Sequence, residues 1–262
     1  MDIRFFHVAA FAEQAFAGNP AIVCLPPGEL PEATMQAIAA EFNLSETAFV
    51  RPEDENWKIR WFTPTTEINL CGHATLAAAH VLVNESLAGT RIKFSSASGP
   101  LEVTSAAGGM LVLDFPVWLP ESCPPPPSLE AILGQPVLEC FQAKGELLAI
   151  VENEDTVRNL KPDLGLLGRL ESHQALVVSA PGRMTDFVSR CFAPRYGIPE
   201  DPVTGAAHCL LTPYWAERLG KSDLVARQVS ARGGLLFCSW DGGSRVRIGG
   251  RALNFAEGKV QF

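Results

Sequence analysis

The sequence predicts an α+β protein built from two similar halves. Three observations favour this class. Short motifs recur in the same order about 130 residues apart, each half places a glycine turn directly before a strong helix-forming segment, and a proline-rich segment separates the two sets. Chance explains any one match, but a shared order at nearly constant spacing favours a duplicated fold.

Three pairs of segments carry the repeat. They are Trp61–Pro64 with Cys191–Pro194, Ser96–Leu101 with Ser230–Leu235, and Leu70–Leu82 with Pro202–Trp215. The first pair is offset by 130 residues and the second by 134. Each half therefore reads as two strands, a glycine turn, a helix and a run of strands.

Hydrophobic alternation and turn residues predict the elements in chain order. Strands are expected at Ile3–Val8, Ala21–Leu25, Leu44–Val50, Trp57–Phe62, Thr90–Phe94, Leu101–Thr104, Met110–Phe115, Leu147–Val151 and Ala175–Ser179. A helix is expected from Pro31, which suits a first helical position, to about Asn43. Further helices are expected after Gly72, after Gly205 and around Pro162–Leu170.

A proline-rich segment suggests a domain boundary. Six prolines lie between Pro116 and Pro127, and the last four are consecutive. Such a segment cannot enter a sheet interior and acts as a semi-rigid spacer. We therefore expect an N-terminal half at residues 1–118 and a C-terminal half at residues 119–262, with the last strand free to return to the first half.

Composition excludes several classes of partner. The chain is 47% apolar and 19% charged, as in well-buried globular proteins, and its formal net charge is −8. No basic run is present, whereas nucleic acids and anionic membranes need clustered lysine and arginine. We therefore expect neither partner. An anionic ligand has to be captured locally, by backbone N–H groups and a few side chains.

Cysteine usage and hydropathy predict a cytoplasmic protein. The seven cysteines form no CxxC pair, which favours reduced thiols. The N-terminus shows no basic segment followed by an apolar stretch, as a secretory signal would require. No apolar run approaches the roughly 20 residues that cross a bilayer.

The two glycine turns place two helix N-termini at equivalent positions, Gly72-His73 and Gly205-Ala206. A helix N-terminus leaves about four N–H groups unpaired and carries partial positive charge, so it suits a carboxylate or phosphate. A pseudo-twofold axis would bring the two ends face to face around a small carboxylate. The alternative is a pair of tight strand-to-helix turns without a ligand.

Glu46 is the first candidate for proton chemistry. It stands between a predicted helix and an apolar strand, beside Leu44 and Phe49. Partial desolvation there would raise its pKa and suit it to general acid–base work. The alternatives are a solvated glutamate, or a helix end at which Ser45 makes the useful contact.

His73 is the second candidate, because it lies in the first turn of its helix beside the proposed anion. It is placed to donate a hydrogen bond to a substrate carboxylate or to move a proton. His80 and His208 are interpreted as core histidines. No HxxxH or HxH spacing occurs and the cysteines are scattered, so we expect no metal.

Asp201 and Thr204 occupy the corresponding place in the second half. Asp201 precedes Pro202, so it is either a functional carboxylate or an ordinary turn residue. Thr204 is interpreted either as a simple N-cap or as a hydrogen-bonding group for a ligand.

At these residues the chain resembles the PhzF (phenazine-biosynthesis-like) family, a branch of the diaminopimelate-epimerase fold. The motifs that carry the resemblance are Phe16–Pro20, Leu44–Phe49, Cys71–Thr75, Phe187–Arg190, Phe192–Pro194 and Glu200–His208. They extend over essentially the whole chain, and together they are highly specific.

The resemblance implies two α/β halves, each a strongly curved sheet around a central helix, with the active site between them. It also implies a cofactor-free isomerase, commonly a homodimer. In the family's phenazine enzyme, a glutamate at the position of Glu46 moves a proton between two carbons, and groups matching His73 and Asp201 assist. The expected substrate-binding positions are Gly72, Ala74, Thr204, Gly205 and Ala206.

One departure from the parent fold matters. Diaminopimelate epimerase places a cysteine before each helix, whereas here Cys71 keeps the first and Asp201-Pro202-Val203 holds no second. A two-thiol racemase is therefore disfavoured, and Cys71 is interpreted as a packing residue. Two other functions stay open, a ligand-binding or interaction module without turnover and an amino-acid epimerase that uses Cys71 alone.

Overall fold

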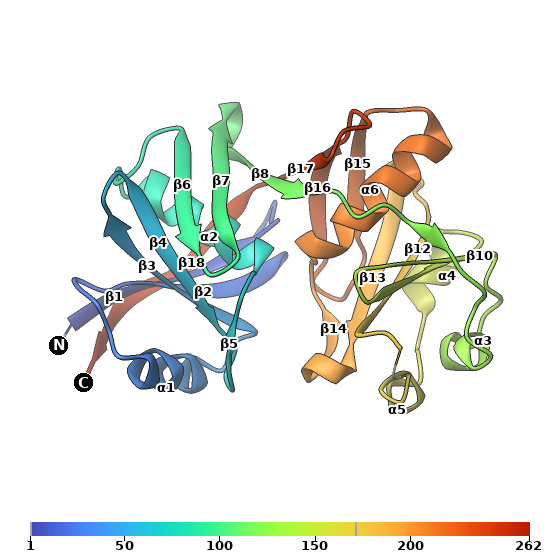
Figure 1. The fold of residues 1–262 in the computed structure, drawn as a ribbon, viewed down its shortest axis with the longest axis horizontal. Coiled ribbons are helices and arrows are strands. Elements are labelled where there is room, and N and C mark those ends of the chain that lie inside the picture. Colours follow the sequence, from blue (N-terminus) through green and yellow to red (C-terminus); the bar gives the residue numbers. More distant parts are fainter. Residues whose placement is uncertain (1, 171) are drawn as a thin grey trace. The chain divides into compact units, whose positions relative to one another are not determined.

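The computed structural model describes residues 2–170 and 172–262, and the chain divides into two compact units (Figure 1). The N-terminal unit comprises the chain up to Asp114 together with Gly249–Phe262. The C-terminal unit comprises Phe115–Ile248. The chain thus returns to its first unit for the last strand.

The N-terminal unit is mainly a sheet with two helices. Its elements are β1 (Asp2–Ala10), β2 (Asn19–Leu25), α1 (Glu32–Phe42), β3 (Glu46–Glu53), β4 (Asn56–Phe62), β5 (Glu67–Ile68), α2 (Gly72–Asn84), β6 (Arg91–Ser96), β7 (Gly99–Ala106), β8 (Met110–Pro116) and β18 (Ala252–Gln261). Strand β1 pairs antiparallel with β2 and β18, and β2 pairs parallel with β3. Strand β4 pairs antiparallel with β3 and β5 and parallel with β6, which continues antiparallel into β7 and β8.

The two helices of this unit pack on opposite faces of the sheet. One face packs against α1, with Ile22 on β2 and Phe49 on β3 in the same apolar cluster as Ile38. Side chains alternate along a strand, so Ala21 and Glu46 project from the other face, toward α2. Helix α2 is buried almost all round, as expected of a central helix, and it contacts β1, β2 and β3.

The C-terminal unit repeats this plan. Its elements are β9 (Glu121–Ser122), α3 (Leu129–Leu133), β10 (Glu139–Ala143), β11 (Glu146–Ile150), α4 (Glu154–Asn159), α5 (Leu164–Leu167), β12 (Ala175–Pro181), β13 (Phe187–Ala193), β14 (Ile198–Asp201), α6 (Gly205–Leu219), β15 (Asp223–Gln228), β16 (Gly234–Ser239) and β17 (Arg245–Gly250). Strands β11 and β12 pair in parallel, as do β13 and β15. The β10–β11, β12–β13, β13–β14 and β15–β16 pairs are antiparallel.

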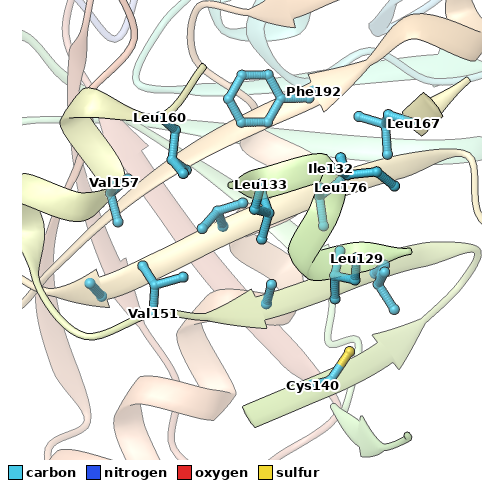
Figure 2. Packing of buried hydrophobic residues seen from close by; sticks show 14 of the residues in the cluster. Leu129, Ile132, Leu133, Cys140, Val151, Val157, Leu160, Leu167, Leu176 and Phe192 are labelled. Carbon is cyan, nitrogen blue, oxygen red and sulfur yellow. The ribbon is translucent and has the colours of Figure 1, made fainter. Parts of the chain in front are cut away.

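This sheet also carries helices on both faces. The short helices α3, α4 and α5 cover one face, where Val157 and Leu167 join Leu176 and Phe192 in an apolar cluster (Figure 2). The other face packs against α6. There the indole N–H of Trp215 donates to Ser179 Oγ at 2.9 Å.

The order of pairings is the same in both units. Each has a parallel pair (β2–β3 and β11–β12), an antiparallel third strand (β4 and β13), a short strand (β5 and β14) and then a buried helix (α2 and α6). The predicted class, α+β in two similar halves around central helices, is confirmed. Two details differ from the prediction, because Pro31 stands at the N-cap of α1 and α5 is shorter than 162–170.

Candidate functional site

The predicted site residues fall into two groups, one in each unit. Glu46, Cys71, Gly72, His73 and Ala74 belong to the N-terminal unit, where β3 begins and α2 starts. The predicted residues Asp201, Thr204, Gly205 and Ala206 belong to the C-terminal unit, where β14 ends and α6 starts. Each group has its own geometry.

Glu46 is the first residue of β3, and the chain reaches it through a helix end at Asn43, which adopts a left-handed conformation with φ +51°. Glu46 pairs with Ala21 of β2 and is only 7% exposed. The alternative of a solvated glutamate therefore does not hold. A carboxylate this deeply buried needs a partner.

His73 supplies that partner. It lies in the first turn of α2, is 5% exposed, and its Nε2 is 3.0 Å from Glu46 Oε2. The other ring nitrogen, Nδ1, lies 3.2 Å from Asn19 Nδ2 and 3.6 Å from Cys71 Sγ. The imidazole therefore bridges the carboxylate on one side and a polar pair on the other.

Electrostatics in this group favour a charged Glu46–His73 pair. Burial opposes ionisation of Glu46, but the charge of His73 and the contacts with His73 and Ser45 outweigh it and lower the pKa of the carboxyl. Burial likewise disfavours the imidazolium, yet the contact of Nδ1 with Cys71 Sγ and the charge of Glu46 outweigh it and raise the pKa of His73 well above its ordinary value. At neutral pH the pair is a carboxylate beside an imidazolium.

Cys71 holds its proton. Burial is the main cause that raises the pKa of its thiol, and the negative charge of Glu46 adds to it. The thiolate is the reactive form of cysteine, so this thiol is poorly suited to act as a base at neutral pH. Its place at the N-cap of α2, without a side-chain capping bond, fits the packing role expected from the sequence.

Glu46, Cys71 and His73 also offer three potential metal-ligand atoms within 4.8 Å of one another. An imidazole ligates a metal through the lone pair of one nitrogen. Here the carboxylate approaches Nε2, whereas the thiol approaches Nδ1. The carboxylate and the thiol therefore lie at different nitrogens of the ring. This arrangement suits proton transfer through the imidazole better than binding of one cation by all three groups.

In the C-terminal unit the side chains of Asp201 and Thr204 form a hydrogen bond. The Thr204 hydroxyl donates to Asp201 Oδ2 at 2.6 Å, so Thr204 occupies the N-cap position of α6 without making the side-chain cap bond. Gln228 joins them from β15. Its amide donates to the Asp201 carbonyl at 2.7 Å and accepts from the Thr204 N–H at 2.9 Å. Thr204 therefore stands at the predicted N-cap position, but its hydroxyl bonds to Asp201 instead of capping the helix.

The two helix starts are built alike. In α2 the Thr75 hydroxyl donates to the Cys71 carbonyl at 2.5 Å, and in α6 His208 Nδ1 donates to the Thr204 carbonyl at 2.8 Å. Position 208 thus corresponds to Thr75. His80 lies in the last turn of α2, half-buried, with its Nε2 2.9 Å from Asn84 Nδ2.

Burial lowers the pKa of His208 to about 4, so its imidazole is neutral. Gly72, Ala74, Gly205 and Ala206 occupy the first turns of the two helices, where backbone N–H groups lack carbonyl partners within the helix.

Two polar residues of these groups were not singled out from the sequence. Asn19 is fully buried beside His73, and Gln228 is fully buried between Asp201 and Thr204. Asn19 is the first residue of β2 and belongs to a glycine–asparagine–proline motif, which is a sequence signal. Gln228 ends a strand without any local signal, and only the pairing of β15 with β13 brings it to the helix start.

Within the part of the chain that the structure describes, no helix combines the length and apolar character needed to span a bilayer. The family model for phenazine biosynthesis-like proteins (PhzC–PhzF) matches residues 8–258. An uncharacterised isomerase of Pseudomonas aeruginosa is 48% identical, and the match covers 100% of both chains. The human phenazine biosynthesis-like domain-containing protein is 38% identical over 99% of both.

Solved structures agree. The crystal structure of a PhzF-family phenazine biosynthesis protein from Enterococcus faecalis has a TM-score of 0.97, with 47% identity and 100% of both chains covered. A hydroxyproline epimerase from Agrobacterium vitis shares the fold alone, with a TM-score of 0.64 and 11% identity over 99% of this chain and 92% of that one. The resemblance predicted from the motifs is confirmed, and the chain belongs to the phenazine biosynthesis-like (PhzC–PhzF) family, several bacterial members of which are named isomerases.

Proposed function

We propose that this protein is a cofactor-independent isomerase that moves a proton within a small carboxylate-bearing substrate, with Glu46 as the general acid and base. The buried Glu46–His73 pair, with 3.0 Å between Nε2 and Oε2, is the observation that carries the proposal. It keeps the carboxylate ionised at neutral pH, and the ionised form is the one that accepts a proton.

The reaction balances without an oxidant or a co-reactant. Glu46 takes a proton from a carbon next to a carbonyl or a double bond, and the electron pair of the broken C–H bond enters that π system. The Glu46 carboxyl then returns the proton to another carbon of the same system, forming a new C–H bond and regenerating the carboxylate. His73 stabilises the ionised form before and after transfer.

The remaining predicted residues have binding roles in this proposal. The N–H groups of Gly72 and Ala74 at the start of α2 suit the substrate carboxylate, as do those of Gly205 and Ala206 at the start of α6. Asp201, oriented by the Thr204 hydroxyl, assists proton movement. That both groups serve one substrate is a prediction from the sequence repeat. A homodimer remains the expectation from the family resemblance, and a cytoplasmic location remains the expectation from cysteine usage and hydropathy.

One alternative is a ligand-binding module without turnover. Incubating the protein in heavy water with a panel of small carboxylic acids that carry an activated C–H bond separates the two. An isomerase incorporates deuterium or shifts a double bond, as NMR detects, whereas a binding module does neither.

The mechanism has its own test in Glu46→Gln, which keeps the shape of the side chain and removes the base. General-base catalysis contributes roughly 10²–10⁴-fold, so exchange should fall by about that factor. Glu41→Gln, the same change at an exposed position of α1, is the matched control and keeps the wild-type rate. Exchange at the wild-type rate in Glu46→Gln would remove the proposal.

A further inference from the structure

The C-terminal unit also has a carboxyl group on the first rung of its parallel strand pair, but on the opposite strand from Glu46. In the N-terminal unit the first rung of the parallel pair joins Ala21 on β2 to Glu46 on β3. In the C-terminal unit the first rung of the corresponding pair joins Glu146 on β11 to Ala175 on β12. Each unit therefore begins its parallel ladder with one carboxyl and one alanine, on exchanged strands.

Strand register places Glu146 on the same face as Asp201. Leu148 pairs with Val177, which pairs with Cys191, which pairs with Asp201, so these four side chains share a face across β11 to β14. Glu146 is two residues before Leu148 and shares that face. This is the face that packs against α6, opposite to the apolar cluster of Figure 2.

One carboxyl oxygen of Glu146, a half-buried residue, is shielded from solvent and unsatisfied. Its Oε2 is buried and has no hydrogen-bond partner among the described residues. A buried polar atom without a partner costs free energy, which a bound ligand can offset. Glu46 Oε2 also lacks a hydrogen bond among the described residues, but it has the His73 imidazole 3.0 Å away.

The titratable groups that face Glu146 come from three elements. They are Cys191 on β13, Asp201 on β14, Tyr196 in the turn between these strands, and Cys209 on α6. Burial raises the pKa values of the two thiols and of the phenol, and Glu146 adds to each, so all three stay uncharged near neutrality. Burial and, less strongly, Asp201 raise the pKa of Glu146 to about 7.

We propose that Glu146 is a ligand-binding carboxyl group of the C-terminal unit and that it acts in its protonated form, donating a hydrogen bond to an anionic ligand beside Asp201. The inference rests on the proposed function, in which the ligand is the substrate carboxylate. A protonated carboxyl is a donor, whereas an ionised Glu146 beside Asp201 would repel an anion. The C-terminal unit therefore takes its anion only while this proton is present.

Acetate is the probe for this proposal, because it carries the carboxylate and nothing else. Acetate affinity is measured by NMR titration, together with the δ-carbon resonance of Glu146 in protein labelled at glutamate, assigned by its loss in Glu146→Gln. We expect the Glu146 resonance to shift on acetate binding. Wild-type affinity should fall about tenfold between pH 6 and pH 8, as the carboxyl with a pKa of about 7 loses its proton.

Three variants separate a binding role from a structural one. Glu146→Gln keeps a donor at every pH and should bind acetate equally at both pH values. Glu146→Leu removes the donor and should bind at least about tenfold more weakly at the lower pH, since it loses a hydrogen bond to a charged group. Glu152→Gln, an exposed position just after β11, should keep the wild-type profile.

Two results would overturn the proposal. One is a Glu146 resonance that does not respond to acetate, and the other is a Glu146→Gln variant that keeps the wild-type pH dependence. Thermal unfolding of each variant checks that it is folded. The measurement needs no turnover, so acetate binding through Glu146 in a protein without exchange activity would distinguish a failure of the proposed isomerase activity from a failure of this inference.

Discussion

Replacing His73 by glutamine leaves the Glu46 carboxylate buried without its positive partner. The pair is 3.0 Å apart, and both residues are less than 10% exposed, so solvent gives little compensation. Removing one member of a buried ion pair typically destabilises a protein by about 3–5 kcal/mol. We expect His73→Gln to lose about that much stability at pH 7.

A double-mutant cycle measures how much of the loss belongs to the pair. Glu46→Gln alone leaves the buried His73 imidazolium without its carboxylate partner, whereas the double variant Glu46→Gln/His73→Gln buries two neutral amides. Its loss should therefore be smaller than the sum of the single losses by at least about 1 kcal/mol, within the range found for contacting residues. Urea unfolding at pH 7 gives the free energies. Losses that add within about 0.5 kcal/mol would refute a charged pair.

Three further outcomes follow from the same geometry. The contribution of the Glu46–His73 pair to stability should be largest between pH 4.5 and 6.5, because the part due to Glu46 is lost as pH falls through its lowered pKa and the part due to His73 is lost as pH rises through its raised pKa. Urea unfolding of wild type and of the double variant from pH 3 to pH 9 tests this. A difference in the free energy of unfolding that does not change with pH would contradict it. The pKa of Glu146 is raised from its ordinary value of 4.5 to about 7, so the free energy of unfolding of wild type should fall by about 3 kcal/mol as pH rises from 4.5 to 7. Glu146→Gln should lack that loss, and a variant with the wild-type pH dependence would contradict the raised pKa of Glu146. Cys71→Ala should keep exchange activity within about threefold, because burial keeps the thiol protonated; a loss of about a hundredfold or more would instead support the epimerase alternative.

Much of the architecture follows from sequence, because duplicated patterns report on topology. The glycine turns before α2 and α6, the motif around Glu46 and the order of strands were all visible as local signals. The sequence does not show which residue of α2 corresponds to His208, because small residues precede both His80 and His208. Only the hydrogen bonds to the cap carbonyls show that His208 corresponds to Thr75.

The partners of the candidate residues were harder to predict, because they depend on contacts across the sheet. Burial of Glu46 could be inferred from its apolar neighbours, but the direction of its pKa shift could not. Desolvation alone predicts a raised pKa, and His73 reverses it. Gln228 and Glu146 stand at strand ends without any local motif, so their roles emerge only from strand register.

The central claim is that the Glu46 carboxylate moves the substrate proton. The most direct test compares deuterium incorporation from heavy water by wild type, Glu46→Gln and Glu41→Gln, with a carboxylic acid that the wild type exchanges. The account predicts wild-type exchange in Glu41→Gln and a loss of roughly 10²–10⁴-fold in Glu46→Gln. Equal exchange by all three proteins would contradict it.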